Sequence, residues 1–62
     1  MRIWFQHHGI FSAMAQPLDV KAKTWLQERF AAGRYYGYTL AVPYRDIQSF
    51  RTQFINAGGE LL

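Results

Sequence analysis

The feature that most constrains the fold is the absence of cysteine from a chain of only 62 residues. A chain of this length buries only about 60% of the surface that its unfolded form exposes, so its hydrophobic core is small. Without cysteine, neither a disulfide nor a thiolate-bound zinc ion can compensate. The missing stability must therefore come from dense packing of the eleven aromatic side chains, or from a partner that covers part of the surface.

The first half of the chain predicts a strand followed by a helix. Residues 1–8 alternate apolar and polar side chains, as a half-buried strand does. Residues 10–16 fit either an apolar loop or an early helical turn. A helix then begins at Pro17 or Asp19 and ends at Gly33, since proline suits a first turn, aspartate an N-cap and glycine a C-terminus. The apolar positions of this helix recur at helical spacing: Leu18, Ala22, Trp25, Leu26 and Phe30.

The second half repeats the order of strand and helix. Residues 34–42 are rich in strand-forming side chains, and Pro43 ends that strand because it has no N–H to donate. A helix begins near Tyr44 to Asp46 and ends at Gly58-Gly59. Residues 60–62 allow a very short edge strand. One side of the second helix carries an apolar stripe: Ile47, Phe50, Phe54 and Ala57.

These elements predict an α+β fold in a single domain, residues 1–62. Two helices cover a small sheet of two or three strands, in the order β-α-β-α with a short final β. No stretch approaches the roughly 18 consecutive apolar residues of a membrane helix. We therefore expect a soluble, cytoplasmic chain that does not engage a membrane.

Residue patterns for catalysis, metal binding or a cofactor are absent. His7 and His8 are adjacent on a predicted strand, so their rings point to opposite faces and do not share a metal ion. The serines lie in no nucleophile motif. Gly58-Gly59 follows a helix instead of preceding one, so it does not form a phosphate-binding loop. We expect neither an enzyme nor a cofactor-binding protein.

The abundance of aromatic side chains, together with a net charge of +3, favours a protein-binding module. Tyrosine, tryptophan, phenylalanine and arginine are enriched at protein interfaces, and so small a core has little room for eleven rings. We therefore predict a linker, adaptor or inhibitor that docks on a larger, acidic protein. The residues predicted to contact it are Trp4, Tyr35, Tyr44, Arg34, Arg45 and Arg51.

Two other functions fit the same composition. A small nucleic-acid-binding protein would place its cations on phosphates, although no helix dense in basic residues is present. The cations it would use are Arg34, Arg45, Arg51, Lys21 and Lys23. A self-associating structural protein would pair copies through a sheet edge or through a surface at Trp4 and Trp25.

The last third of the chain resembles a known family. Val42-Pro43-Tyr44 is followed by thirteen residues and then by Gly58-Gly59-Glu60-Leu61. This order is similar to the C-terminal half of the small phycobilisome linker domain of rod-capping and core linkers, over Val42–Leu61 only. The resemblance implies a non-catalytic linker whose partner is an acidic phycobiliprotein. Residues 10–33 depart from the family, because they contain a predicted helix where the family has a loop-like basic segment.

Overall fold

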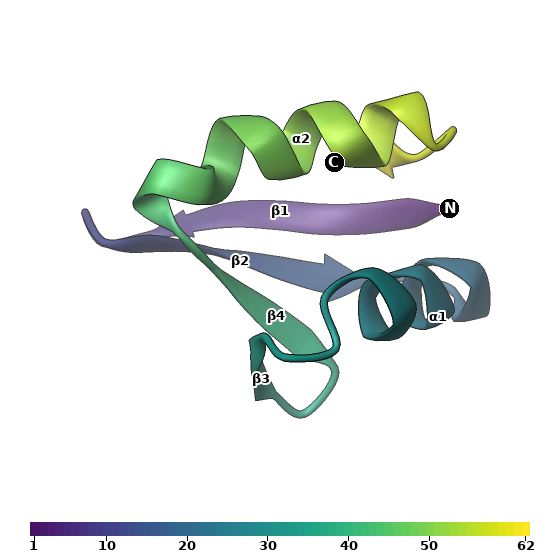
Figure 1. Ribbon diagram of the computed structural model, residues 1–62, viewed down its shortest axis with the longest axis horizontal. Coiled ribbons are helices and arrows are strands. Elements are labelled where there is room, and N and C mark those ends of the chain that lie inside the picture. The colour runs from purple at the N-terminus through teal and green to yellow at the C-terminus, as the bar shows by residue number, and fades with distance from the viewer.

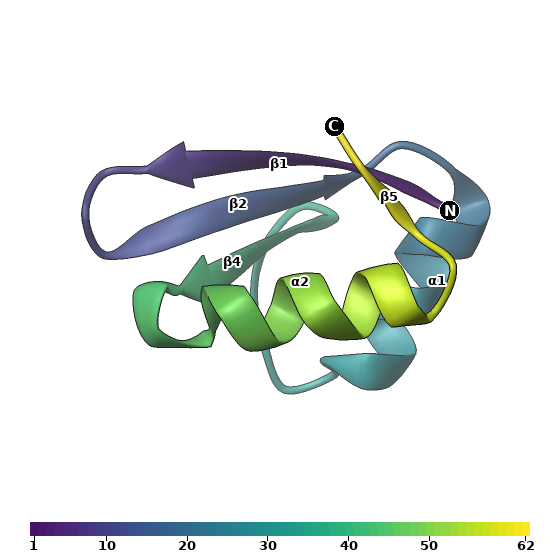
Figure 2. The same cartoon turned by 90° about the horizontal axis from the view of Figure 1, so that it is seen from above.

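The computed structural model describes all residues 1–62. Its elements are β1 (Arg2–His8), β2 (Ser12–Pro17), α1 (Val20–Arg29), β3 (Arg34–Tyr36), β4 (Thr39–Pro43), a short 3₁₀ helix (Tyr44–Asp46), α2 (Ile47–Asn56) and β5 (Glu60–Leu61). The strands form one sheet in the order β3-β4-β2-β1-β5, in which β5 is parallel to β1 and the other neighbours are antiparallel. Both helices pack on one face of this sheet (Figure 1 and Figure 2).

The α+β class agrees with the prediction, but the predicted sheet of two or three strands is wrong. The sheet has five strands, and the order along the chain is β-β-α-β-β-α-β instead of β-α-β-α-β. Two local features account for the difference: a second strand immediately after β1, and a turn inside the predicted strand 34–42.

The second strand, β2, lies where a loop or a helical turn was expected. Ala13 and Ala15 are completely buried against the helices, while Met14 and Gln16 point to the other side of the sheet. Alanine is depleted in strands, so the residues themselves signal a strand weakly. Backbone pairing with β1 on one side and with β4 on the other holds this segment in the extended conformation, which its own residues do not favour.

The turn between β3 and β4 divides the predicted single strand. Gly37 adopts φ 64°, a left-handed conformation that suits the first position of a two-residue hairpin turn. Tyr35 pairs with Leu40 across this hairpin, so Tyr35 lies on the face that the helices cover. Tyr36 lies on the opposite face. One continuous strand over residues 34–42 would instead put Tyr36 on the same face as Leu40 and Val42, with Tyr35 on the other face, so the turn exchanges the two tyrosines.

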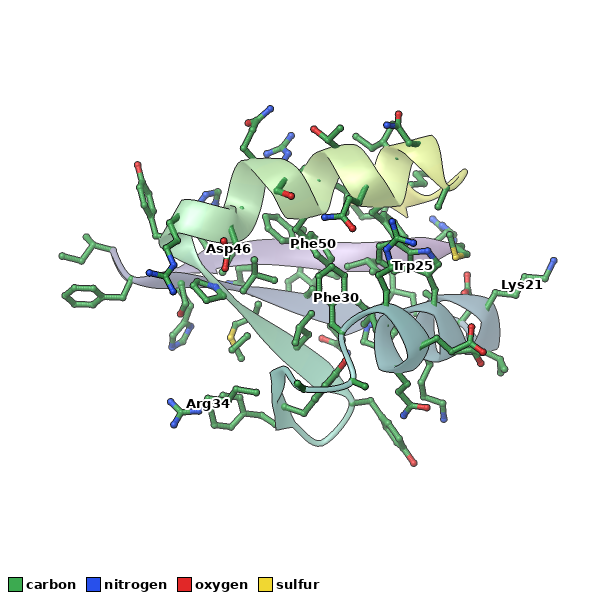
Figure 3. All side chains as sticks on the ribbon, in the orientation of Figure 1. Lys21, Trp25, Phe30, Arg34, Asp46 and Phe50 are labelled. Atoms are coloured by element: carbon green, nitrogen blue, oxygen red, sulfur yellow. The ribbon has the colours of Figure 1, made fainter.

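The core lies between the sheet and the helices. The predicted stripe on α2 is confirmed for Ile47, Phe50 and Phe54, which are buried, but not for Ala57, which is exposed just after the end of the helix. Phe50 stacks on Phe5 of β1 with ring centroids 5.5 Å apart, and Trp25 of α1 meets Phe54 edge to face at 5.1 Å. Figure 3 shows Trp25, Phe30 and Phe50 together between the layers. Packed rings thus join both helices to the sheet in a chain without disulfides.

Polar contacts fix where the helices begin and end. The Oδ1 atom of Asp19 accepts a hydrogen bond from the backbone N–H of Ala22 at 2.8 Å, which caps α1 as predicted. Its Oδ2 atom accepts from the backbone N–H of Arg2 at 3.0 Å, so the same carboxylate joins α1 to β1. After α2, Gly58 adopts φ 88° and turns the chain back toward β1.

Candidate binding surface

The face of the sheet opposite the helices is not covered by any other part of the chain. None of the side chains on this face is buried. The residues of the face are Arg2, Trp4, Gln6, His8, Ser12, Met14, Gln16, Arg34, Tyr36, Thr39, Ala41, Pro43 and Glu60. Glu60 is the single carboxylate in any strand, and it forms an exposed ion pair with Arg2 at 3.5 Å. The uncovered face therefore combines aromatic and amide side chains with a positive balance of charge.

The turn between β1 and β2 carries two large apolar side chains in solvent. Ile10 is 76% exposed and Phe11 is 79% exposed. The backbone N–H of Tyr44 donates to the carbonyl oxygen of Phe11 at 2.8 Å, which holds a third exposed ring beside the turn. We call Ile10, Phe11 and Tyr44 the hairpin tip. Turns usually carry glycine, proline or short polar residues, so an apolar tip is unusual.

Two shallow hollows flank the hairpin tip. The first, the face hollow, has a volume of about 700 Å³ and lies on the uncovered face. It is lined by His8, Phe11, Ser12, Met14, Arg34, Tyr36, Ala41 and Pro43. The second, the edge hollow, has a volume of about 390 Å³ and lies between the end of β1 and the beginning of α2. It is lined by His7, Tyr44, Arg45, Ile47, Gln48 and Arg51.

The structure brings some of the predicted contact residues together. Tyr44, Arg45 and Arg51 line the edge hollow, although Arg51 is six residues further along the chain than Arg45. Arg34 lines the face hollow and points away from the core (Figure 3). Trp4 is 48% exposed on the uncovered face, as its place in the strand pattern predicted. Of these five residues, one belongs to the hairpin tip, two line the edge hollow beside it, and Arg34 and Trp4 lie on the uncovered face.

The prediction that Tyr35 faces outward is wrong. Its hydroxyl donates to the carbonyl oxygens of Leu26 and Phe30, at 2.9 and 3.0 Å. The ring is half-buried against the core, and this burial raises the pKa of the Tyr35 hydroxyl. Tyr35 therefore closes the C-terminal end of α1 and is not part of the binding surface.

Sequence reasoning also missed the most exposed residues of this surface. The sequence places Ile10 and Phe11 in a segment that fits either a loop or a helical turn, and an unbroken strand over residues 34–42 would put Tyr36 on the face of Leu40. The signal that could have located them is Gly9, whose φ of 73° begins the turn. A glycine between two segments that can form strands is a signal for a hairpin turn.

The remaining cations do not extend this surface. The Lys23 ammonium lies 4.0 Å from the centre of the Tyr38 ring, on the opposite side of the fold from the edge hollow. Lys21 is exposed near the beginning of α1 (Figure 3). The basic residues therefore form separate groups, not one continuous stripe.

No group of three or more histidine, aspartate or glutamate side chains is placed to hold a metal ion. Both helices are too short and too polar to cross a lipid bilayer. The chain matches no protein-family model, no curated protein and no solved structure.

Proposed function

We propose that this chain is a non-enzymatic protein-binding module that docks through the hairpin tip and the arginines beside it. The observation that carries the proposal is the exposure of Ile10 and Phe11 at the end of a hairpin. Two adjacent large apolar side chains in solvent are costly unless a partner covers them, and exposed apolar patches mark interaction sites. A ring that enters a partner's pocket, surrounded by weaker contacts, is the usual anchor of an interface.

The charge around the tip favours an acidic partner. Arg45 and Arg51 lie on one side of the tip and Arg34 lies on the other. Asp46, which follows Arg45 in the chain, does not line the edge hollow; it lines a separate hollow between α2 and β4, which Arg34 also lines. Complementary charge at the rim of an interface speeds association and selects the partner, while the buried rings supply most of the affinity.

The resemblance of Val42–Leu61 to phycobilisome linkers suggests one candidate for this partner, an acidic phycobiliprotein. Within that segment Tyr44 belongs to the hairpin tip, and Arg45 and Arg51 line the edge hollow. We include this partner in the proposal, and it is tested by titrating the chain directly into a purified phycobiliprotein.

A capture experiment with matched variants tests the proposed function. The wild-type chain, the double variant Ile10→Ser/Phe11→Ser and the control Val20→Ser are used as baits in extracts of the source organism. Val20 is also an exposed apolar residue, but it lies at the beginning of α1, away from the tip. Wild type and Val20→Ser should capture the same protein, and the double variant should lose it. Equal capture by all three baits contradicts the proposal.

A second candidate, binding of single-stranded nucleic acid, is favoured by the uncovered face. Trp4 and Tyr36 expose rings on which bases can stack, and Arg34 lies beside Tyr36 on the same face. Self-association through the hairpin tip is the third possibility, and light scattering of the purified chain separates it from both. A monomer across a wide concentration range excludes it.

A further inference from the structure

The outer edge of β1 is only partly paired. The N–H of Phe5 donates to the Leu62 carbonyl at 3.2 Å, and the N–H of Leu62 donates to the Ile3 carbonyl at 2.9 Å. In an antiparallel ladder the backbone N–H and C=O of one residue point to the same side of the strand. The odd-numbered residues of β1 therefore direct both of these groups away from β2. His7 follows the same alternation. Its N–H and C=O point outward beyond the end of β5, where residues 1–62 place no strand.

Figure 2 looks onto this edge. There β5 crosses over the N-terminal part of β1 and leaves the C-terminal part uncovered. No proline or lysine blocks the uncovered part, which ends in His7 and His8. Such an edge is a template for a further strand, since its unpaired N–H and C=O groups match those of an extended peptide.

The edge hollow lies directly beside these unpaired groups. His7 shares the helix side of β1 with Phe5, and the two rings meet edge to face at 6.1 Å. A strand paired opposite His7 would send alternate side chains to that side, into the edge hollow. The hollow is lined by Ile47, which is almost completely buried, and by the side chains that follow it on α2.

The lining of the edge hollow determines which side chain fits it. Arg45 and Arg51 both line it, and no carboxylate does. An acidic side chain placed in the hollow near Arg51 therefore complements its lining.

We infer that the outer edge of β1 binds an extended acidic segment of the partner protein by strand addition, with an Asp or Glu side chain placed in the edge hollow beside Arg51. This inference rests on the proposed protein-binding function and names the chemistry of the segment recognised. The hairpin tip and the β1 edge are adjacent, so one partner can occupy both.

Defined peptides test the inference on the whole chain. One short, blocked peptide alternates valine with glutamate, a second alternates valine with lysine, and a third is the glutamate peptide with N-methylated backbone amides. Binding is followed by the chemical shift and hydrogen exchange of the His7 amide. The glutamate peptide should shift this amide and slow its exchange, because the amide gains a hydrogen-bond acceptor. The N-methylated peptide should do neither.

A charge reversal supplies the second readout. Arg51 is exposed, so Arg51→Glu should leave the fold unchanged. The variant should bind the glutamate peptide about fivefold more weakly than wild type does and should prefer the lysine peptide. An unaltered His7 amide, equal binding of the N-methylated peptide, or an unchanged charge preference each overturns the inference. If the Phe11-dependent capture persists in such a case, the proposed function stands and only the strand addition fails.

Discussion

The hydroxyl of Tyr35 lies 2.9 Å from the carbonyl oxygen of Leu26, so a residue of β3 closes the end of the helix that precedes it. The last carbonyls of a helix have no partner within the helix. Here the Leu26 and Phe30 carbonyls accept the backbone N–H groups of Phe30 and Gly33, and the Tyr35 hydroxyl shares its proton between the two oxygens, which holds the end of α1 against the first strand of the following hairpin.

Removal of this hydroxyl should destabilise the fold without changing binding. We expect Tyr35→Phe to lower the free energy of unfolding by about 1 kcal/mol, because it removes a hydrogen-bond donor that two carbonyls at the end of α1 share. Denaturant unfolding followed by circular dichroism measures the change. Tyr36→Phe is the control, since Tyr36 is exposed and its hydroxyl makes no hydrogen bond within the chain. Equal losses in the two variants would contradict the assigned role of Tyr35.

The ring cluster under α2 should carry much of the stability. Phe54 is completely buried and contacts Trp25 and Phe50. Phe54→Ala should cost about 3–5 kcal/mol, through lost burial and the cavity left behind. A domain of this size has a total stability of the same order, so the variant should be largely unfolded at room temperature. Ile55→Ala, one residue further along on the exposed side of α2, should retain the wild-type circular dichroism spectrum.

The cap at Asp19 should make stability depend on pH. The hydrogen bond from the Ala22 N–H lowers the pKa of the Asp19 carboxyl, with smaller contributions from the nearby N-terminus and Arg2. Since the folded state holds the charged form, its stabilisation is complete above the unfolded pKa and is lost as the pH falls through the folded pKa.

Asp19→Asn keeps an oxygen that can accept the capping hydrogen bond but has no charge to titrate. Wild type should be more stable than this variant near neutral pH, and the gap should close as the pH falls below about 4. Thermal unfolding at a series of pH values measures the gap. Glu28→Gln removes a carboxylate from α1 away from the cap and serves as the control. A gap that is constant across the series would show that the Asp19 charge does not act through the cap.

The sequence predicted the helices better than the sheet. Pro17 to Asp19 and the diglycine bounded both helices to within a few residues, because caps and glycine stops are local signals. In contrast, β2 has Ala13 and Ala15 at its buried positions, and only pairing with β1 and β4 makes that segment a strand. Pairing between strands is not encoded in a local pattern.

Half of the binding surface could be inferred from residue type, and its arrangement could not. Trp4 and Tyr44 were predicted to be exposed, and they are. Tyr35 and Tyr36 were exchanged because Gly37 was read as a strand residue, and its turn changes which tyrosine faces the core. Gly59 has a role that the sequence pattern does not reveal. It packs against the Phe54 ring, where there is no room for a Cβ atom.

The salt dependence of binding should distinguish the two proposed ligands. Affinity for the protein partner should change little between about 50 and 200 mM salt, because buried rings carry most of that affinity. Affinity for single-stranded DNA should fall steeply over the same range, because each phosphate contact releases counterions.

Phe11→Ala should weaken protein binding at least about tenfold, a loss of about 1.4 kcal/mol or more. Trp4→Ala should act mainly on nucleic acid, through lost base stacking. Val20→Ala should affect neither ligand. Isothermal titrations across the salt series measure the affinity of the wild type and of the three variants for each ligand. Tight binding of single-stranded DNA that persists at physiological salt and falls with Trp4→Ala would instead make nucleic-acid binding on the uncovered face the function of this chain.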